Sequence, residues 1–211
     1  MTEKSAKDLL EGAYALQTPT DNVNYYADFA AIYDDGYVAD MGYQSPRFIA
    51  QYLQEVVADK GLKIADIGCG TGLIADHLTG HHIDGYDISP QMIEVARRKN
   101  LYRDFFCADL TGDLSGLPKD YDALVSAGTF TLGHLNADHL LNLTTLLKPA
   151  AWVAITISHA HFDKTDFEEK LQRAVERDQI STPEYRAFSI YSKTDHTHSS
   201  DKGWLTRFQT R

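Results

Sequence analysis

The stretch KIADIGCGTGLIADHL, residues 63–78, combines a short apolar strand with a glycine-rich turn. The apolar residues of 64–67 fit a buried strand, and those of 73–78 recur at the spacing of one helix face. The chain must therefore turn between Gly68 and Gly72, and the next helix is expected to begin at once. Such a turn directs unpaired backbone N–H groups and the positive end of a helix dipole at whatever lies above it. The pattern predicts a ligand site.

Length and composition indicate one domain of ordinary size. The 211 residues are 43% apolar, which is enough to fill a sizeable core. Within this domain we expect a helical lid segment over residues 1–60 and a ligand-binding core over residues 61–211. The first of these is rich in tyrosine and carries no strand signal. It would expose its aromatic rings unless it packed over the ligand.

Charge and hydropathy restrict the partners. The formal net charge of -10 disfavours nucleic acid, because binding phosphates needs an excess of Lys and Arg. No run approaches the roughly 18 apolar residues of a membrane span, and the N-terminus lacks the apolar run of a signal peptide. Cys69 and Cys107 show no paired spacing and are expected to be free thiols. We therefore expect a cytoplasmic protein that binds a small molecule or another protein, without nucleic acid or membrane; its oligomeric state is left open.

Strand-like and helix-like segments alternate beyond the turn. This order is typical of a parallel sheet with helices on both faces. Ser89 and Pro90 fit the N-cap and first position of a helix. Segments 185–195 and 203–211 flank a polar turn and predict an antiparallel hairpin at one end of the sheet. The other expected strands are 82–88, 102–109, 121–128 and 151–158, and the expected helices are 89–99, 137–147 and 166–179.

The glycine spacing distinguishes between ligand classes. Gly68-x-Gly70-x-Gly72 differs from the dinucleotide fingerprint Gly-x-Gly-x-x-Gly. Leu73 stands where that fingerprint has its third glycine, which argues against an NAD-linked enzyme. A glycine-rich turn alone can also be only a tight connection.

Three aspartates strengthen the ligand interpretation. Asp66 lies in the strand before the turn, and Asp87 ends the next strand, where a carboxylate can accept hydrogen bonds from two ribose hydroxyls. Asp109 ends the third strand, where it can meet the exocyclic amine of adenine. Each alone could be a solvated strand end or a helix cap. Their alignment with one glycine turn favours a nucleoside ligand.

Together with LKPAAWVAI at 147–155, these residues resemble the motif series of class I S-adenosylmethionine-dependent methyltransferases, over about residues 25–160. The resemblance implies an α/β, Rossmann-like fold, a doubly wound and mostly parallel seven-stranded sheet with an antiparallel C-terminal hairpin. It also implies S-adenosyl-L-methionine as the cofactor. The segments YADFAAIYD, GYQSP, GYDISPQMIEVAR and SAGTFTLGH are similar, more narrowly, to methyltransferase-like proteins of the Williams-Beuren chromosomal region and their bacterial relatives. Ala150-Ala151 departs from the two glycines usual in relatives, at a turn remote from the cofactor.

The resemblance implies roles for individual residues. Gly68 and Gly70 would let the backbone approach the methionine portion of the cofactor, and Asp66 would orient the turn and the amino group. Asp87 would bind the ribose. Tyr26 would close over the cofactor, although it could also belong to a helix packing face. The same applies to Tyr33, and the remaining cofactor-binding residues implied are Cys69, Ile88, Met92, Asp109, Leu110 and Ser126.

His134 is the candidate catalytic residue. It follows the fourth strand on the expected acceptor side and could act as a general base if the acceptor carries a proton at working pH. A histidine in such a loop can equally be a surface residue. The acceptor is unidentified, and the composition favours a small molecule.

Three alternatives remain. The chain could bind the cofactor without catalysis, or it could be an NAD-linked oxidoreductase, which Leu73 disfavours. The pairs His159-x-His161 and His196-x-His198 could suggest a metal site, but two-residue spacing without a nearby carboxylate pattern is weak support. No metal is expected.

Overall fold

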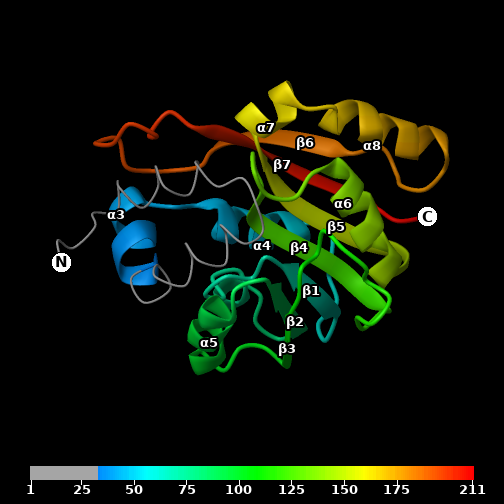
Figure 1. Cartoon of the computed structure of the whole chain (residues 1–211), viewed down its shortest axis with the longest axis horizontal. Coiled ribbons are helices and arrows are strands. Elements are labelled where there is room, and N and C mark those ends of the chain that lie inside the picture. The colour runs from blue at the N-terminus through cyan, green and yellow to red at the C-terminus, as the bar shows by residue number, and fades with distance from the viewer. Residues whose placement is uncertain (1–32) are drawn as a thin grey trace.

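The computed structural model describes residues 33–211 (Figure 1). These residues form one seven-stranded sheet in the order β3-β2-β1-β4-β5-β7-β6. Five strands run parallel, while β7 is antiparallel to both of its neighbours, β5 and β6. The fold class is therefore confirmed, including the terminal hairpin. The strands are β1 (Lys63–Ile67), β2 (His82–Asp87), β3 (Asp104–Cys107), β4 (Tyr121–Phe130), β5 (Leu147–Ser158), β6 (Glu184–Ser189) and β7 (Lys202–Gln209).

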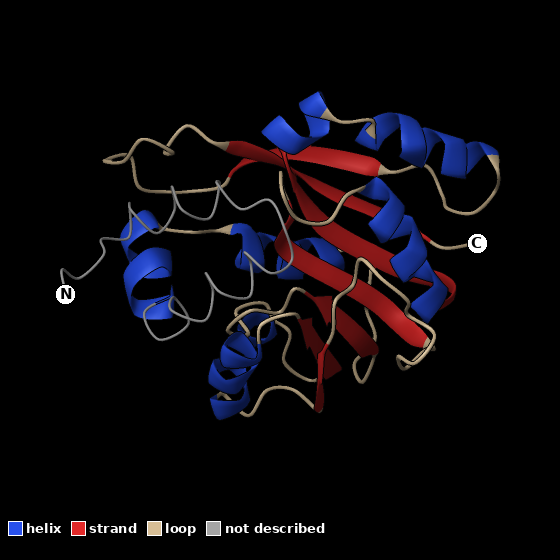
Figure 2. Ribbon diagram, viewed as in Figure 1, coloured by secondary structure: helices blue, strands red, loops and turns tan. Residues whose placement is uncertain are grey.

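Helices cover both faces of the sheet (Figure 2). The α-helices are α3 (Ala39–Met41), α4 (Ser45–Gln54), α5 (Pro90–Arg98), α6 (Ala137–Leu143), α7 (His159–Lys164) and α8 (Phe167–Glu176). A π-helix, η2, spans Tyr33–Val38, and the 3-10 helices are η3 (Ala75–His77) and η4 (Thr144–Leu146).

Each face of the sheet has its own hydrophobic core. Leu124 of β4 packs with α6 and α8, whereas its neighbours Ala123 and Val125 pack with α4 and η3 on the opposite face. Successive side chains of a strand point to opposite faces, so a central strand buried on both sides reads as a nearly continuous apolar run. Such apolar runs are the signal in the sequence that predicts β4 and β5.

The helix expected directly after the glycine turn is the main difference from the sequence prediction. Gly68 and residues 70–74 form turns, and only the three-residue η3 follows. Gly72 has φ of 87°, outside the right-handed helical region, so regular helix cannot begin there. Ile74 and Leu78 are still buried in the core. Their helix-like spacing therefore reports burial rather than a full α-helix.

Several local signals were predicted correctly. Ser89 caps α5, because its hydroxyl accepts a hydrogen bond from the backbone N–H of Met92. The helical pieces expected before residue 60 include α4, whose inner face is buried in the core. Tyr26 and most of the predicted lid lie outside the described residues, so the division into lid and core stays a prediction. No helix in residues 33–211 is long and apolar enough to cross a membrane.

Candidate functional site

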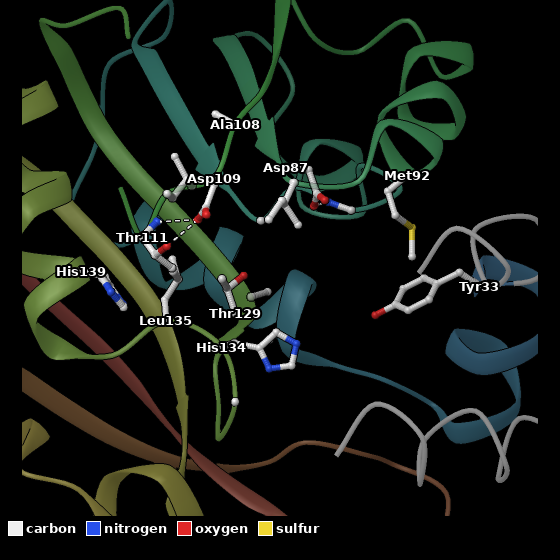
Figure 3. A pocket seen from close by; sticks show the side chains of 17 residues that line it. Tyr33, Asp87, Met92, Ala108, Asp109, Thr111, Thr129, His134, Leu135 and His139 are labelled. Atoms are coloured by element: carbon white, nitrogen blue, oxygen red, sulfur yellow. Dashed lines mark hydrogen bonds between the residues drawn. The ribbon is translucent and has the colours of Figure 1, made fainter. Parts of the chain in front are cut away.

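A cavity of about 420 Å³ opens at the carboxyl ends of the parallel strands (Figure 3). Ligands of open α/β sheets bind at this edge, and the volume lies within the usual range for small-molecule sites. The cavity brings together the glycine turn, the ends of β2 and β3, and the loop that follows β4. Its lining residues are Tyr33, Gly68, Gly70, Asp87, Ile88, Met92, Ala108, Asp109, Leu110, Thr111, Ala127, Gly128, Thr129, Gly133, His134, Leu135 and His139.

The glycines of the turn serve different purposes. Gly68 has φ of 65°, and a β-carbon there would lie 2.1 Å from Oγ1 of Thr129, so packing excludes any side chain. Gly70 has φ of 54°, and a β-carbon there would have no neighbour within 4 Å. Both line the cavity, and a side chain at Gly70 would fill open space above the turn. This absence of side chains leaves the backbone of the turn accessible to a ligand.

Asp87 fixes the turn to the end of β2. One carboxylate oxygen accepts a hydrogen bond from the N–H of Gly70 at 2.8 Å, and the other accepts one from the N–H of Ser89 at 2.8 Å. Burial raises the pKa of Asp87, and these two backbone donors oppose that rise. A carboxylate has about four acceptor sites, so the side chain can still accept hydrogen bonds from a ligand in the cavity.

Asp66 is buried beneath the turn and does not line the cavity. Its Oδ2 accepts a hydrogen bond from the Tyr102 hydroxyl at 2.6 Å, whereas Oδ1 has no hydrogen-bond partner among the described residues. Burial raises the pKa of Asp66 to about 7, with the Tyr102 hydrogen bond opposing and the charge of Asp87 adding to the rise. A buried acceptor without a partner costs free energy.

The far side of the cavity is built around Asp109. Its Oδ1 accepts hydrogen bonds from the N–H and the hydroxyl of Thr111, at 2.9 and 2.7 Å (Figure 3). Ile88 and Leu110 add apolar lining, and Met92, from the first turn of α5, lines the opposite side of the cavity near Tyr33 (Figure 3). A carboxylate between apolar surfaces suits a flat, partly polar group such as an adenine ring.

His134 enters the cavity from the loop after β4 (Figure 3). Its Nδ1 lies 3.3 Å from the carbonyl oxygen of Leu132 and 3.1 Å from Oγ1 of Thr131. The carbonyl oxygen can only accept, so in the neutral ring Nδ1 carries the hydrogen and Nε2 is the proton-accepting atom. Burial lowers the pKa of His134, and the Leu132 carbonyl opposes this shift. The ring is therefore neutral near pH 7.

Two of the predicted residues lie behind the cavity wall. Ser126 is buried, and its hydroxyl donates to the carbonyl of Ile67 at 2.7 Å. Cys69 is buried with its sulfur against Gly85 of β2, and burial raises the pKa of this thiol. Neither side chain lines the cavity, so any contact of these two residues with a ligand would involve the backbone.

Other lining residues were missed by sequence reasoning. Thr129, Gly133 and Leu135 belong to β4 and the loop after it, and His139 lies in the first turn of α6. In His139, Nδ1 accepts a hydrogen bond from the N–H of Asn136 in a reciprocal capping box, which fixes the orientation of the ring. The only sequence signal for them was the dense run of glycine, threonine and histidine after β4.

The histidine pairs do not gather into a metal site within residues 33–211, where no three His, Cys, Asp or Glu side chains are placed to hold an ion. His159 stacks against Trp204 with ring centroids 4.7 Å apart, and His161 is buried near Phe167. His196 packs edge-on against Tyr191. These histidines therefore take part in aromatic packing beside the sheet.

Residues 64–151 match a family model described as a methyltransferase domain. Methyltransferase-like protein 27 of Homo sapiens is 26% identical over 176 residues, which cover 80% of this chain and 70% of that protein. Malonyl-[acyl-carrier protein] O-methyltransferase of Bacillus anthracis is 27% identical over 173 residues, 72% of this chain and 61% of that protein. The 18S rRNA (guanine-N(7))-methyltransferase of Bos taurus is 38% identical, over only 34% of this chain and 26% of its own length.

Solved structures share the fold. A TehB-like S-adenosylmethionine-dependent methyltransferase of Corynebacterium glutamicum has a TM-score of 0.61 at 24% identity, covering 89% of this chain and 99% of the other. Magnesium protoporphyrin IX methyltransferase of Synechocystis, solved with bound S-adenosylmethionine, has a TM-score of 0.67 at 18% identity, covering 93% and 99% of the two chains. The narrower resemblance to proteins of the Williams-Beuren region stays a prediction.

Proposed function

We propose that this chain, which belongs to the class I S-adenosylmethionine-dependent methyltransferases, transfers the methyl group of S-adenosylmethionine to a small-molecule acceptor. The acceptor would bind in the cavity beside His134. The observation that carries the proposal is that one cavity combines the side-chain-free glycine turn and Asp87 with a neutral, partly buried histidine. The first part suits the cofactor. The second suits an acceptor that must lose a proton.

Several features support a fit between the residues present and the cofactor. The backbone at Gly68 and Gly70 is open to the methionine portion, and Asp87 has acceptor sites left for the ribose hydroxyls. Asp66 lies beneath the turn outside the cavity, so the charge of its ionised carboxylate would favour the methionine ammonium group without direct contact. Asp109 would accept a hydrogen bond from the adenine amine, with Ile88 against the ring.

The bound cofactor supplies a methyl group on a sulfonium, which is the electrophile of the reaction. The chain then has to hold the acceptor in line with that methyl group and keep water away. His134 would take the proton of the acceptor at Nε2, because Nδ1 is engaged with the Leu132 carbonyl. A lowered pKa keeps the ring able to accept that proton near pH 7.

The charge around the cavity supports a small, uncharged acceptor. No lysine or arginine is among the described residues that line it. A nucleic acid needs cations to neutralise its phosphates, and a carboxylate acceptor is also usually held by a cation. The relatives include an rRNA methyltransferase and a malonyl O-methyltransferase, whose names indicate both of these acceptor kinds. The net charge of -10 and the uncharged acceptor side favour a neutral phenol, thiol or amine instead.

A direct screen tests the proposal. The protein is incubated with S-adenosylmethionine and matched panels of phenols, thiols, amines and carboxylic acids, and formation of S-adenosylhomocysteine is measured. We expect turnover in the phenol, thiol or amine panel. Asp87→Ala serves as the control that should lower turnover at limiting S-adenosylmethionine concentration by weakening cofactor binding. Turnover confined to carboxylic acids, or to RNA in a parallel assay, would contradict the acceptor class.

A further inference from the structure

Asp34 ties the segment before α4 to the glycine turn. The hydroxyl of Thr71, within the turn, donates to Oδ1 of Asp34 at 2.5 Å. The ammonium group of Lys99, at the end of α5, lies 2.8 Å from Oδ2 of the same carboxylate. One side chain thus joins the π-helix η2 to the turn and to the helix that begins beside it.

These contacts are partly shielded from water. The side chains of Asp34 and Lys99 are 29% and 22% exposed, and Thr71 is buried. Lys99 also contacts Asp76 at 3.1 Å. Burial lowers the pKa of Lys99, but the hydrogen bonds that its ammonium group donates to the two carboxylates outweigh this effect and raise the pKa above its usual value. The lysine therefore stays charged, and a shielded pair of this kind is stronger than an exposed one.

The other end of the same segment has a separate anchor. The carbonyl of Gly42 accepts hydrogen bonds from the N–H and the hydroxyl of Ser192, at 2.9 and 3.2 Å. The N–H of Gln44 donates to the carbonyl of Ile190 at 2.9 Å. Residues 42–44 are thus fixed to the loop between β6 and β7, and the Asp34 contacts hold the segment where it reaches the cavity.

Tyr33 is the residue next to Asp34, and its side chain points into the cavity (Figure 3). We propose that Asp34 is a positioning residue that holds Tyr33 over the bound cofactor by anchoring its backbone to Thr71 and Lys99. The proposal rests on the proposed function, because it takes the cavity as the cofactor site. It assigns the carboxylate no contact with the cofactor itself.

Both partners of Asp34 contribute to the geometry. Asparagine at this position could still accept the Thr71 hydrogen bond but would lose the charge pair with Lys99. Alanine would lose both. The two variants therefore separate the contributions, and Asp34→Asn should lie between the wild type and Asp34→Ala.

The first test measures two quantities on the whole chain. S-adenosylhomocysteine binding is followed by calorimetry, and hydrogen exchange of the backbone at 33–41 is followed without ligand. For Asp34→Ala we expect about tenfold weaker binding, equivalent to about 1.4 kcal/mol, together with faster exchange at 33–41. The matched control is Asp76→Asn, which removes the charge of the other partner of Lys99 but leaves the Asp34 contacts in place. Its binding should stay close to that of the wild type.

A double-mutant cycle identifies the route of the effect. If Asp34 acts through Tyr33, Asp34→Ala should weaken binding much less in a Tyr33→Ala background than in the wild type. Fully additive losses would overturn the proposal, as would unchanged exchange at 33–41 in Asp34→Ala. A wild-type chain that fails to bind S-adenosylhomocysteine would instead contradict the proposed function. Hydrogen exchange at 33–41 would then still test whether Asp34 holds this segment in place. Thermal unfolding of each variant excludes global destabilisation, and Asp34→Asn provides the milder change.

Discussion

Oγ1 of Thr129, near the end of β4, occupies the space that a side chain on Gly68, after β1, would need, 2.1 Å from the position of its β-carbon. The two neighbouring parallel strands therefore meet at a point where only hydrogen is tolerated. Thr129 also reaches the carbonyl of Ile67 at 3.2 Å, so it cannot move away without losing that hydrogen bond. The glycine is required by the sheet as well as by the cavity.

Gly68→Ala should lower the free energy of unfolding by about 1–3 kcal/mol, because overpacking and positive φ both act against it. Urea unfolding measures the change. Gly70→Ala is the matched control, since a β-carbon there has no neighbour within 4 Å and only the positive φ of 54° opposes it. We expect the control to be less destabilised but to bind S-adenosylmethionine more weakly. Equal losses of stability in both variants would show that Thr129 yields easily.

Asp87→Ala should weaken S-adenosylmethionine binding by roughly 1–3 kcal/mol, because charge-assisted hydrogen bonds to the ribose would be lost in a partly buried site. Calorimetry gives the dissociation constant. Asp113→Ala is a suitable control, since Asp113 is exposed, caps its own turn through Ser115 and does not line the cavity. An unchanged dissociation constant for Asp87→Ala would mean that another residue holds the ribose.

Asp66 predicts a pH dependence with a defined sign. Its pKa in the folded chain is raised from 3.8 to about 7, so the folded state binds the proton more tightly than the unfolded state. Its contribution to stability is therefore present below about pH 4 and is lost as the pH rises towards 7. Asp87 shifts in the same direction. Urea unfolding between pH 4 and 7.5 should show a weaker decline for Asp66→Asn than for the wild type.

The same ionisation should affect the cofactor in the opposite direction. If the charge of ionised Asp66 attracts the methionine ammonium group through the turn, the affinity for S-adenosylmethionine should rise as the pH passes through about 7. Asp66→Asn should flatten this profile, as measured by calorimetry at each pH. A profile that keeps its slope in Asp66→Asn would assign the pH dependence to another group.

His134→Gln should reduce kcat by about 10²–10⁴-fold with a protic acceptor, because general-base catalysis typically contributes that factor. The dissociation constant of S-adenosylmethionine should change little. His159→Gln is the control, since His159 stacks on Trp204 and does not line the cavity. A similar loss of kcat in both variants would indicate a general effect on the sheet rather than proton transfer.

The part of the candidate site around the glycine turn was largely predictable from sequence. Gly68, Gly70 and Asp87 sit where parallel strands end, and the alternation of strand and helix places all such ends at one edge. Topology alone therefore brought them together. Asp66 was also expected beside the glycine turn. Its hydrogen bond with the Tyr102 hydroxyl was not predictable, because Tyr102 follows α5 and hydrophobic periodicity does not indicate such a polar contact.

The part of the candidate site beside His134 was less predictable for a physical reason. Leu135 and His139 reach the cavity through the connection from β4 to α6, whose path depends on the positive φ of Gly133 and on the Asn136 capping box. Turns of this kind leave no hydrophobic period. The missing helix after Gly72 has a similar cause, because backbone conformation overrode an apolar spacing that fitted a helix.

The place of β7 in the sheet has a consequence for biosynthesis. β6 joins the sheet only by pairing with β7, which itself pairs with β5, although β6 precedes β7 in the chain. While the ribosome still holds residues 202–209, the edge of β5 lacks its partner and β6 has nowhere to dock. The nascent chain must therefore keep an exposed strand edge until this segment emerges, and that interval is when it is most open to chaperone binding or aggregation.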